Sequence, residues 1–198
     1  LNRLLNLNHD TSNSIINYLQ LPINTLFFDV VKFPLFFSHA IHEYVDENAE
    51  VTVKTFIKNP AGTKVEYKIY EGEDVIKSVT VNGESTEAVL TIENVHLWNG
   101  VKDPYLYCME ATLIKEGEEI DEVCNRFGCR SFKIDPDNGF ILNGEEYPLR
   151  GVSRHQDRWG VGNALLPEHH EEDIDLICEV GCTTIRLAHY QHDQYFYD

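Results

Sequence analysis

The 198-residue sequence has no run of Lys or Arg residues to offset its acidic side chains. It contains 16 basic residues against 33 acidic ones, and its formal net charge is −17 at pH 7. Such a charge repels phosphate backbones and anionic lipid surfaces, so we expect neither a nucleic acid nor a membrane as a partner. Neutral and cationic ligands remain compatible with it.

No hydrophobic stretch is long enough to cross a bilayer, which requires about 20 residues. The longest one lies within residues 26–37 and is interrupted by Asp29, Lys32 and Pro34. The sequence begins at Leu1 and shows no basic segment before an apolar stretch and no small-residue cleavage site, so no secretory signal is recognisable. With 42% apolar residues the composition is typical of a soluble globular protein, and we expect a cytoplasmic one.

The cysteines lack the C-x-x-C spacing of zinc sites and redox motifs, and their number is odd. We therefore predict five free thiols, which favours a reducing compartment. The five are Cys108, Cys124, Cys129, Cys178 and Cys182. Motifs of nucleophilic hydrolases, phosphate loops, zinc proteases and dinucleotide-binding folds are also absent, and we expect no cofactor in this chain.

The chain divides into three segments by pattern. Residues 1–37 have no convincing period and are left unassigned, although Asp10-Thr11-Ser12 could cap a short helix. In residues 38–134, apolar and polar residues alternate from Glu50 onward between turn signals, which predicts about seven short strands and a β-sandwich of immunoglobulin-like size. Because no cysteine on an early strand can meet Cys108, we expect this core to be held by packing alone.

Residues 135–198 show a different pattern. An Asn-Gly hairpin at residues 140–147 is followed by a short strand, a loop, a helix and a further strand at residues 183–188. Pro167 marks the first turn of the helix and Gly181 its end. The expected buried stripe of this helix consists of Ile174, Ile177 and Cys178. Strand, helix and strand in about 40 residues predict a βα unit of a parallel sheet.

Arg186 alternates with apolar neighbours on the last strand. Ile185 and Leu187 share one face of that strand and Arg186 occupies the other. If the helix covers the apolar face, Arg186 points to the opposite side of the sheet, where a buried guanidinium needs a carboxylate partner. The acidic residues of the helix's first turn are not placed to provide one. The alternative is a strand-end arginine that reaches solvent.

Two histidines follow the two strands of this unit. His155 comes after the first strand and His189 after the second, so both should emerge at the carboxyl edge of the sheet, where ligands bind in α/β folds. The alternative is that both are ordinary surface histidines. Asp157 and Trp159 lie in the first loop, where a carboxylate could bind sugar hydroxyls and an indole could stack on a sugar, although solvation and packing are the more common roles.

We expect the other histidines and the carboxylates of this region to be solvated. His169 and His170 lie in a polar first turn of the predicted helix. The acidic residues lie in turns and at the helix start, and none ends a pair of inward-facing strands, where a retaining glycosidase needs two carboxyl groups about 5–5.5 Å apart. His189 and His192 resemble a zinc pair only in outline, because no third ligand is apparent.

Several ordered motifs carry a family resemblance. They are LWNG at residues 97–100, DPYLY at 103–107, FGCR at 127–130, GFILNG at 139–144, LRGVSRHQD at 149–157 and IRLAHY at 185–190. Together they closely resemble glycoside hydrolase family 2, specifically its β-galactosidases, over residues 38–198. The resemblance implies a mainly β chain, with an immunoglobulin-like β-sandwich at 38–134 followed by the first βα units of a (β/α)8 TIM barrel at 135–198.

The resemblance also implies a function. Family 2 enzymes hydrolyse with retention, and a β-galactosidase would cleave terminal β-D-galactosides such as lactose with two glutamates on later barrel strands. Those glutamates would lie beyond residue 198, so no catalytic residue is expected here and the chain alone should be inactive. His155 and His189 match histidines that contact the galactosyl ring, and Arg186 matches an arginine beside the nucleophile. Asp157 completes the expected substrate-binding set, and we expect a homo-oligomeric full-length parent that could bind magnesium.

Two kinds of alternative stay open. Other family 2 specificities, β-glucuronidase or β-mannosidase, are disfavoured only by the residues of the RHQD and AHY motifs. A standalone β-sandwich that acts as an interaction or carbohydrate-binding module is the alternative from another class. The sequence also departs from the family at Thr183, where Asn is usual, and at Gln191, where Pro is usual, and residues 1–37 do not resemble the jelly-roll domain expected upstream.

Overall fold

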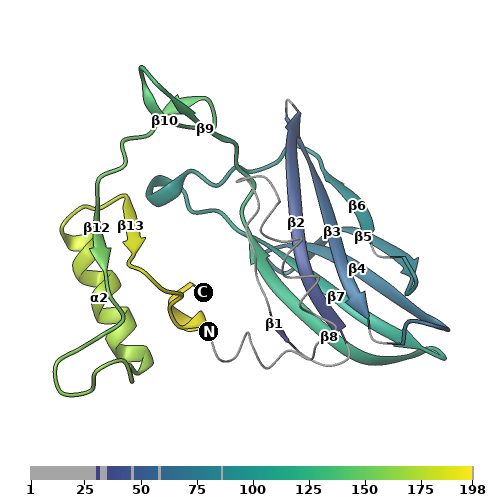
Figure 1. Ribbon diagram of the computed structural model, residues 1–198. Coiled ribbons are helices and arrows are strands. Elements are labelled where there is room, and N and C mark those ends of the chain that lie inside the picture. The colour runs from purple at the N-terminus through teal and green to yellow at the C-terminus, as the bar shows by residue number, and fades with distance from the viewer. Residues whose placement is uncertain (1–29, 32–34, 46, 58, 86, 198) are drawn as a thin grey trace. The chain divides into compact units, whose positions relative to one another are not determined.

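A computed structural model describes residues 30–31, 35–45, 47–57, 59–85 and 87–197, with side chains from residue 47 onward (Figure 1). The predicted segment 1–37, apart from its strand residues at 30–31 and 35–37, lies outside the described residues, as does the helix expected there. The chain divides into two compact units. The first contains the described residues up to His96 together with Tyr105–Cys129, and the second contains Leu97–Pro104 together with residues 130–197.

The first unit consists of two antiparallel four-stranded sheets (Figure 1). One has the strand order β1-β2-β3-β6, with bounds Val30–Val31, Leu35–Val45, Asn48–Ile57 and Glu87–Ile92. The other has the order β5-β4-β7-β8, with bounds Asp74–Asn82, Thr63–Glu71, Tyr107–Lys115 and Glu118–Phe127. The predicted sandwich is confirmed, and β2, which starts at Leu35, pairs with β3 along its length.

Period-two alternation builds the core of this unit, because every second side chain of a strand faces the same way. The buried apolar side chains of β3, β4, β6 and β7 are Ala49, Val51, Val53, Val65, Tyr67, Ile69, Ala88, Leu90, Ile92, Tyr107, Met109, Ala111 and Leu113. One buried hydrogen bond joins the two sheets, since Thr55 Oγ1 of β3 lies 2.7 Å from Tyr67 Oη of β4. As expected, no disulfide among the described residues joins the two sheets, and this hydrogen bond adds a polar contact to the packed core.

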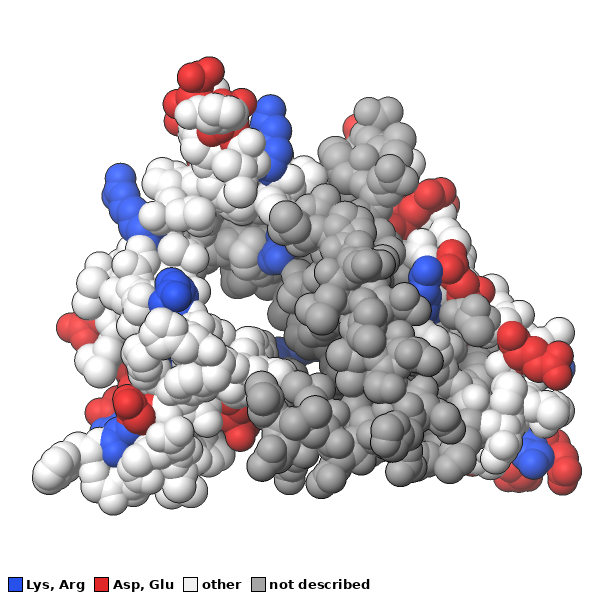
Figure 2. Space-filling view, in the orientation of Figure 1, with Lys and Arg blue, Asp and Glu red and all other residues white. Residues whose placement is uncertain are grey.

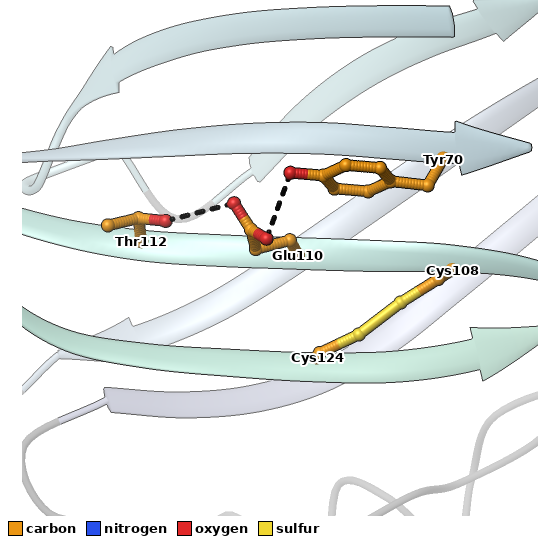
Figure 3. The surroundings of a disulfide bond; sticks show 5 residues. All are labelled: Tyr70, Cys108, Glu110, Thr112 and Cys124. Atoms are coloured by element: carbon orange, nitrogen blue, oxygen red, sulfur yellow. Dashed lines mark hydrogen bonds between the residues drawn. A yellow bond between two sulfur atoms is a disulfide. The ribbon is translucent and has the colours of Figure 1, made fainter. Parts of the chain in front are cut away.

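The prediction of five free thiols is also wrong. A disulfide joins Cys108 of β7 to Cys124 of β8 (Figure 3). In the antiparallel register Cys108 faces Arg126 and Glu110 faces Cys124, so the two cysteines are diagonal neighbours with Cα atoms 6.6 Å apart. The spacing of 16 residues hid this pair, because only the register of the hairpin shows that they meet. The bond links strands of one sheet and does not cross between the sheets.

Three cysteines remain free thiols as predicted. Cys129 is buried, Cys178 is exposed and Cys182 is half-buried. Burial raises the pKa of the Cys129 thiol to about 12, so this thiol stays protonated and unreactive at neutral pH. Since two of the five cysteines are oxidised, cysteine usage no longer supports a reducing compartment.

The second unit contains a small antiparallel sheet in the order β11-β10-β9, with bounds Glu145–Glu146, Gly139–Leu142 and Phe132–Asp135. The predicted Asn-Gly hairpin is confirmed: Asn143 and Gly144 both have positive φ (50° and 86°), as a type I′ turn requires. The Asn143 amide donates to Trp98 O at 3.0 Å, which ties the segment around the 3-10 helix η1 (Gly100–Lys102) to this unit. The expected boundary after residue 134 falls inside β9, whose partner β10 belongs to the second unit.

The predicted βα unit follows. Strand β12 (Gly151–Arg154) pairs in parallel with β13 (Thr184–Leu187), and helix α2 (Pro167–Glu179) connects them (Figure 1). Pro167 occupies the start of α2, and Gly181 has a φ of 81° just beyond its end, as both residues predicted. A short helix α3 (Gln194–Tyr197) follows β13.

The surface carries its charge in a mixed pattern. On the face shown in Figure 2, the described Lys and Arg side chains stand singly among acidic and uncharged ones, and these described residues form no basic patch there. Among the residues that the structure describes, no helix is both long and apolar enough to span a membrane.

The two units differ in how much apolar surface they bury, and this difference predicts their stability. In the described part of the second unit only Ile141, Leu142 and Ala188 are buried apolar residues. Val152 is 38% exposed, and Ile185 and Leu187 are half-buried. We expect limited proteolysis to cut residues 140–197 while the sandwich stays intact, because few buried contacts must break to open that region. First cuts within β3, β4 or β7 would contradict this expectation.

Candidate functional site

The parallel pairing of β12 and β13 fixes which side chains share a face. Val152 pairs with Ile185, Ser153 with Arg186, and Arg154 with Leu187. Arg154 contacts α2, so the face that contains Arg154 and Leu187 is the one that the helix covers. Ser153 and Arg186 occupy the opposite face, and both are exposed.

The predicted orientation of Arg186 is therefore confirmed, because it points away from α2. Its expected carboxylate partner is absent from the described residues, where Arg186 forms no ion pair and reaches solvent. Among the described residues, Arg186 is therefore the solvent-exposed arginine of the alternative interpretation. A partner for Arg186 can only be proposed from outside residues 47–197.

The structure brings His155 and His189 together at the carboxyl edge of the two strands. Their ring centroids lie 5.4 Å apart in an edge-on arrangement, and both side chains are exposed. The Tyr190 ring lies 6.3 Å from that of His155. His189 has a φ of 65°, a left-handed conformation that side-chain-bearing residues seldom adopt and that often marks functional sites. The expected proximity is confirmed, and the binding role of the pair stays a prediction.

Hydrogen bonds connect the loops that carry these histidines. The backbone N–H of Gln156 donates to Tyr190 Oη at 2.9 Å, and the backbone N–H of Asp193 donates to Gln156 Oε1 at 2.6 Å. Each contact spans more than 30 residues of sequence. Sequence reasoning did not single out Gln156 or Tyr190 for this role, because nothing local to either residue shows that the two loops meet.

Asp157 and Trp159 take no part in the described contacts that surround the His155–His189 pair. Both are exposed, and Trp159 is 99% exposed, so its indole stacks on no described side chain. Both lie in the loop between β12 and α2. Their expected contacts with a sugar stay predictions.

The most buried charge of the unit is Arg154, which sequence reasoning missed. Arg154 is 6% exposed; its Nε donates to Asp173 Oδ2 at 2.8 Å and its Nη2 lies 2.7 Å from the same oxygen. Nη1 lies 2.9 Å from His192 Nδ1, and Nη2 lies 3.0 Å from His170 Nδ1. The guanidinium also lies 4.0 Å from the centre of the Phe196 ring, on its face. One side chain thus links β12, α2 and the loop after β13.

Two predictions about α2 need correction. His170 was expected in solvent and is 3% exposed, because it occupies the stripe that faces the sheet, with Asp173, Ile174 and Ile177 at spacings of three, four and seven. That spacing was the signal available in the sequence. Cys178 was expected in the buried stripe and is exposed.

His169 was likewise expected to be solvated, and it has a local role instead. Its Nδ1 accepts a hydrogen bond from the backbone N–H of Leu166 at 3.1 Å, which satisfies a backbone donor at the start of α2. The side chain is half-buried. His169 therefore supports the helix terminus and lies apart from the histidine pair.

His170 and His192 must both be neutral in this arrangement, because each accepts a hydrogen bond from the guanidinium through Nδ1. The network assigns their protons to Nε2. Burial, followed by the charge of Arg154, lowers the pKa of both imidazoles below the ordinary 6.5. The Nε2 atom of His192 is buried and has no hydrogen-bond partner among the described residues.

These lowered pKa values predict that the second unit weakens between pH 7 and pH 5. The unfolded chain takes up protons on His170 and His192 near pH 6.5, whereas the folded chain does so only at lower pH. Stability from this source is fully present above about pH 6.5 and is lost as the pH falls below it. Native-state hydrogen exchange of the α2 amides at the two pH values measures the effect. A free energy of opening that is equal at both would contradict it.

The described residues contain no group of three or more His, Cys, Asp or Glu side chains that could hold a metal ion. His189 and His192 do not act as a pair, because the His192 imidazole turns to Arg154 while that of His189 lies against His155.

Comparison with known proteins identifies relatives of both units. The chain is 45% identical over 143 residues to a β-glucuronidase of Bacteroides fragilis, covering 69% of this chain and 19% of that protein. It is 30% identical to a β-galactosidase of Bacteroides ovatus, covering 73% of this chain and 16% of that protein. Among solved structures, the FMN-binding β-glucuronidase of Facaelibacterium prausnitzii matches with a TM-score of 0.77 and 39% identity, covering 80% of this chain and 25% of that one. The chain thus spans less than a fifth of the length of either curated relative.

Two family models match almost the whole described chain. The model of glycosyl hydrolases family 2 matches residues 38–130, and the model of the family's TIM barrel domain matches residues 133–198. The boundary between them lies close to the start of the second unit at Arg130, although the first model also covers Leu97–Pro104, which belong to the second unit. The chain belongs to glycosyl hydrolase family 2 and comprises its immunoglobulin-like domain and the first part of its TIM barrel.

Proposed function

We propose that this chain is part of a retaining β-glycosidase and that its second unit supplies part of the sugar-binding edge of the barrel. The observation that carries the proposal is the proximity of His155 and His189, 5.4 Å apart at the carboxyl edge of two parallel strands. Active sites of (β/α)8 barrels lie at that edge. Two exposed imidazoles there can donate to, or accept from, the hydroxyl groups of one sugar ring.

The remaining candidate residues have roles that follow from their positions. Arg186 is exposed on the face opposite α2, where a carboxylate from a later barrel strand could pair with it. Asp157 could bind a sugar hydroxyl from the loop after β12. The acid and the nucleophile, two glutamates in a retaining family, would come from beyond residue 198. Magnesium binding and homo-oligomer formation are proposals for that longer protein only.

Two sugars are supported about equally. The residues of the RHQD and AHY motifs favour terminal β-D-galactosides, and relatives named β-galactosidases include one at 30% identity. The relative at 45% identity and the solved structure at 39% are named β-glucuronidases, which favours terminal β-D-glucuronides. The two sugars differ at C6, where a glucuronide carries a carboxylate that requires a cationic or hydrogen-bonding partner.

A pair of assays tests this proposal. The chain of 198 residues should release no chromophore from p-nitrophenyl β-D-galactoside or p-nitrophenyl β-D-glucuronide, because an acid and a nucleophile must flank one bond. The longer protein that contains it should hydrolyse one of the two substrates with retention. Turnover that follows the isolated chain through purification at constant specific activity would show that the glutamates are not required from elsewhere. A longer protein inactive on both substrates would refute the proposed function.

A further inference from the structure

Arg154 stands directly before His155 and also contacts both sides of His189. Its backbone C=O accepts a hydrogen bond from the N–H of Ala188 at 3.0 Å, one residue before His189. Its Nη1 lies 2.9 Å from Nδ1 of His192, three residues after His189. The segment that carries His189 is therefore fixed at both ends by one residue, and that residue is covalently bonded to His155.

We propose that Arg154 is the positioning residue of the sugar-binding edge, which fixes the separation of the His155 and His189 imidazoles through its simultaneous contacts with Ala188, His192 and helix α2. That the edge binds a sugar rests on the proposed function. The contacts of Arg154 with Ala188, His192 and α2 do not depend on it. Arg154 is 6% exposed and turned toward the helix, so it reaches no sugar itself.

The backbone conformation of His189 shows why such fixing is needed. A φ of 65° costs free energy for a residue with a β-carbon, and it persists only when the surroundings enforce it. The two anchors at Ala188 and His192 enclose this residue. Releasing one of them allows the segment to relax to a negative φ, which would move the imidazole away from His155.

A guanidinium suits this position better than an ammonium group. Its planar fork presents donors in several fixed directions, and here they meet the Asp173 carboxylate, His170 Nδ1 and His192 Nδ1 at once. A lysine at the same position would offer one nitrogen on a flexible chain. Lysine could keep the ion pair with Asp173, but it could not also hold both imidazoles, so the contact with His192 should be lost.

The test compares Arg154→Lys with Arg158→Lys in the 198-residue chain by NMR. Arg158 is a matched control, because it also pairs with a carboxylate of α2, Glu172, but its side chain is 37% exposed and this ion pair involves neither His170 nor His192. In the wild-type chain and in Arg158→Lys we expect cross-relaxation between the His155 and His189 rings, and Nε2–H tautomers for His170 and His192. In Arg154→Lys the ring contact should disappear while the α2 amides stay helical.

A second variant covers the case in which Arg154→Lys unfolds α2. His192→Phe keeps a ring of similar shape between Tyr190 and Phe196 and leaves the Arg154–Asp173 pair intact, but it removes the anchor after His189. The His155–His189 contact should again disappear. A ring contact that persists in His192→Phe, or in a folded Arg154→Lys, would overturn the proposal. These NMR readouts need no sugar and no turnover, so they stay valid even if the proposed function is refuted.

Discussion

In the longer glycosidase proposed above, His189→Ala is expected to lower kcat and kcat/KM together by about 30-fold to 900-fold, which corresponds to about 2–4 kcal/mol. His189 lies at the carboxyl edge beside His155, where its imidazole can meet a ring hydroxyl whose hydrogen bond strengthens as the sugar flattens toward the oxocarbenium-like transition state. An interaction made more strongly in that state affects turnover and not binding alone. Steady-state kinetics with the better of the two chromogenic substrates measures both parameters.

Two further variants test whether the effect comes from the His189 imidazole itself, as opposed to its backbone conformation or the loss of any histidine in this unit. His189→Asn lacks the imidazole but tolerates the left-handed backbone, so it should lose activity to a similar extent. His169→Ala removes a histidine of the same βα unit whose imidazole bonds to the helix start. It should change the activation free energies that correspond to kcat and kcat/KM by less than about 0.5 kcal/mol. If His189→Ala raised KM with kcat intact, the residue would bind the ground state only. Equal effects of His189→Ala and His169→Ala would refute the site itself.

Arg154→Leu is expected to destabilise the second unit by about 2–4 kcal/mol. Removing one partner of a buried ion pair leaves the other charge uncompensated, a loss of about 3–5 kcal/mol in fully buried cases. The Asp173 side chain is 31% exposed and can be partly rehydrated, which reduces the effect. The acceptor atoms of His170 and His192 also lose their donor.

Native-state hydrogen exchange of the α2 and β13 amides measures this loss, since it reports the second unit separately from the sandwich. Arg158→Leu is the matched control. Its ion pair with Glu172 joins side chains that are 37% and 53% exposed, so its removal should cost less than about 1 kcal/mol. Similar small effects of the two substitutions would mean that the Arg154 cluster adds little to the stability of this unit.

Local pattern was sufficient for most of the fold. Alternation along Val51, Val53 and Thr55 predicted a strand with one buried face, and these three side chains are 0–1% exposed. Pro167 and Gly181 marked the ends of a helix that spans Pro167–Glu179. These signals succeed because a strand or a helix end is determined by residues within a few positions of one another.

Pairing between distant residues was not predictable in the same way. The disulfide between Cys108 and Cys124 depends on the register of β7 and β8, which the spacing of 16 residues does not specify. The bond between Thr55 and Tyr67 depends on how two sheets face each other. In both cases the chemistry was visible in the sequence and the partner was not.

By itself the sequence determined the elements, the family resemblance and the edge at which His155 and His189 emerge, because parallel strands must end at a common edge. It also determined that Arg186 faces away from the helix, through the parity of one strand. Only the tertiary structure decided that Arg154 is the buried cation of the unit. Its imidazole partners His170 and His192 lie 16 and 38 residues away, on a helix and a loop, and a buried charge is stable only where such acceptors converge in space.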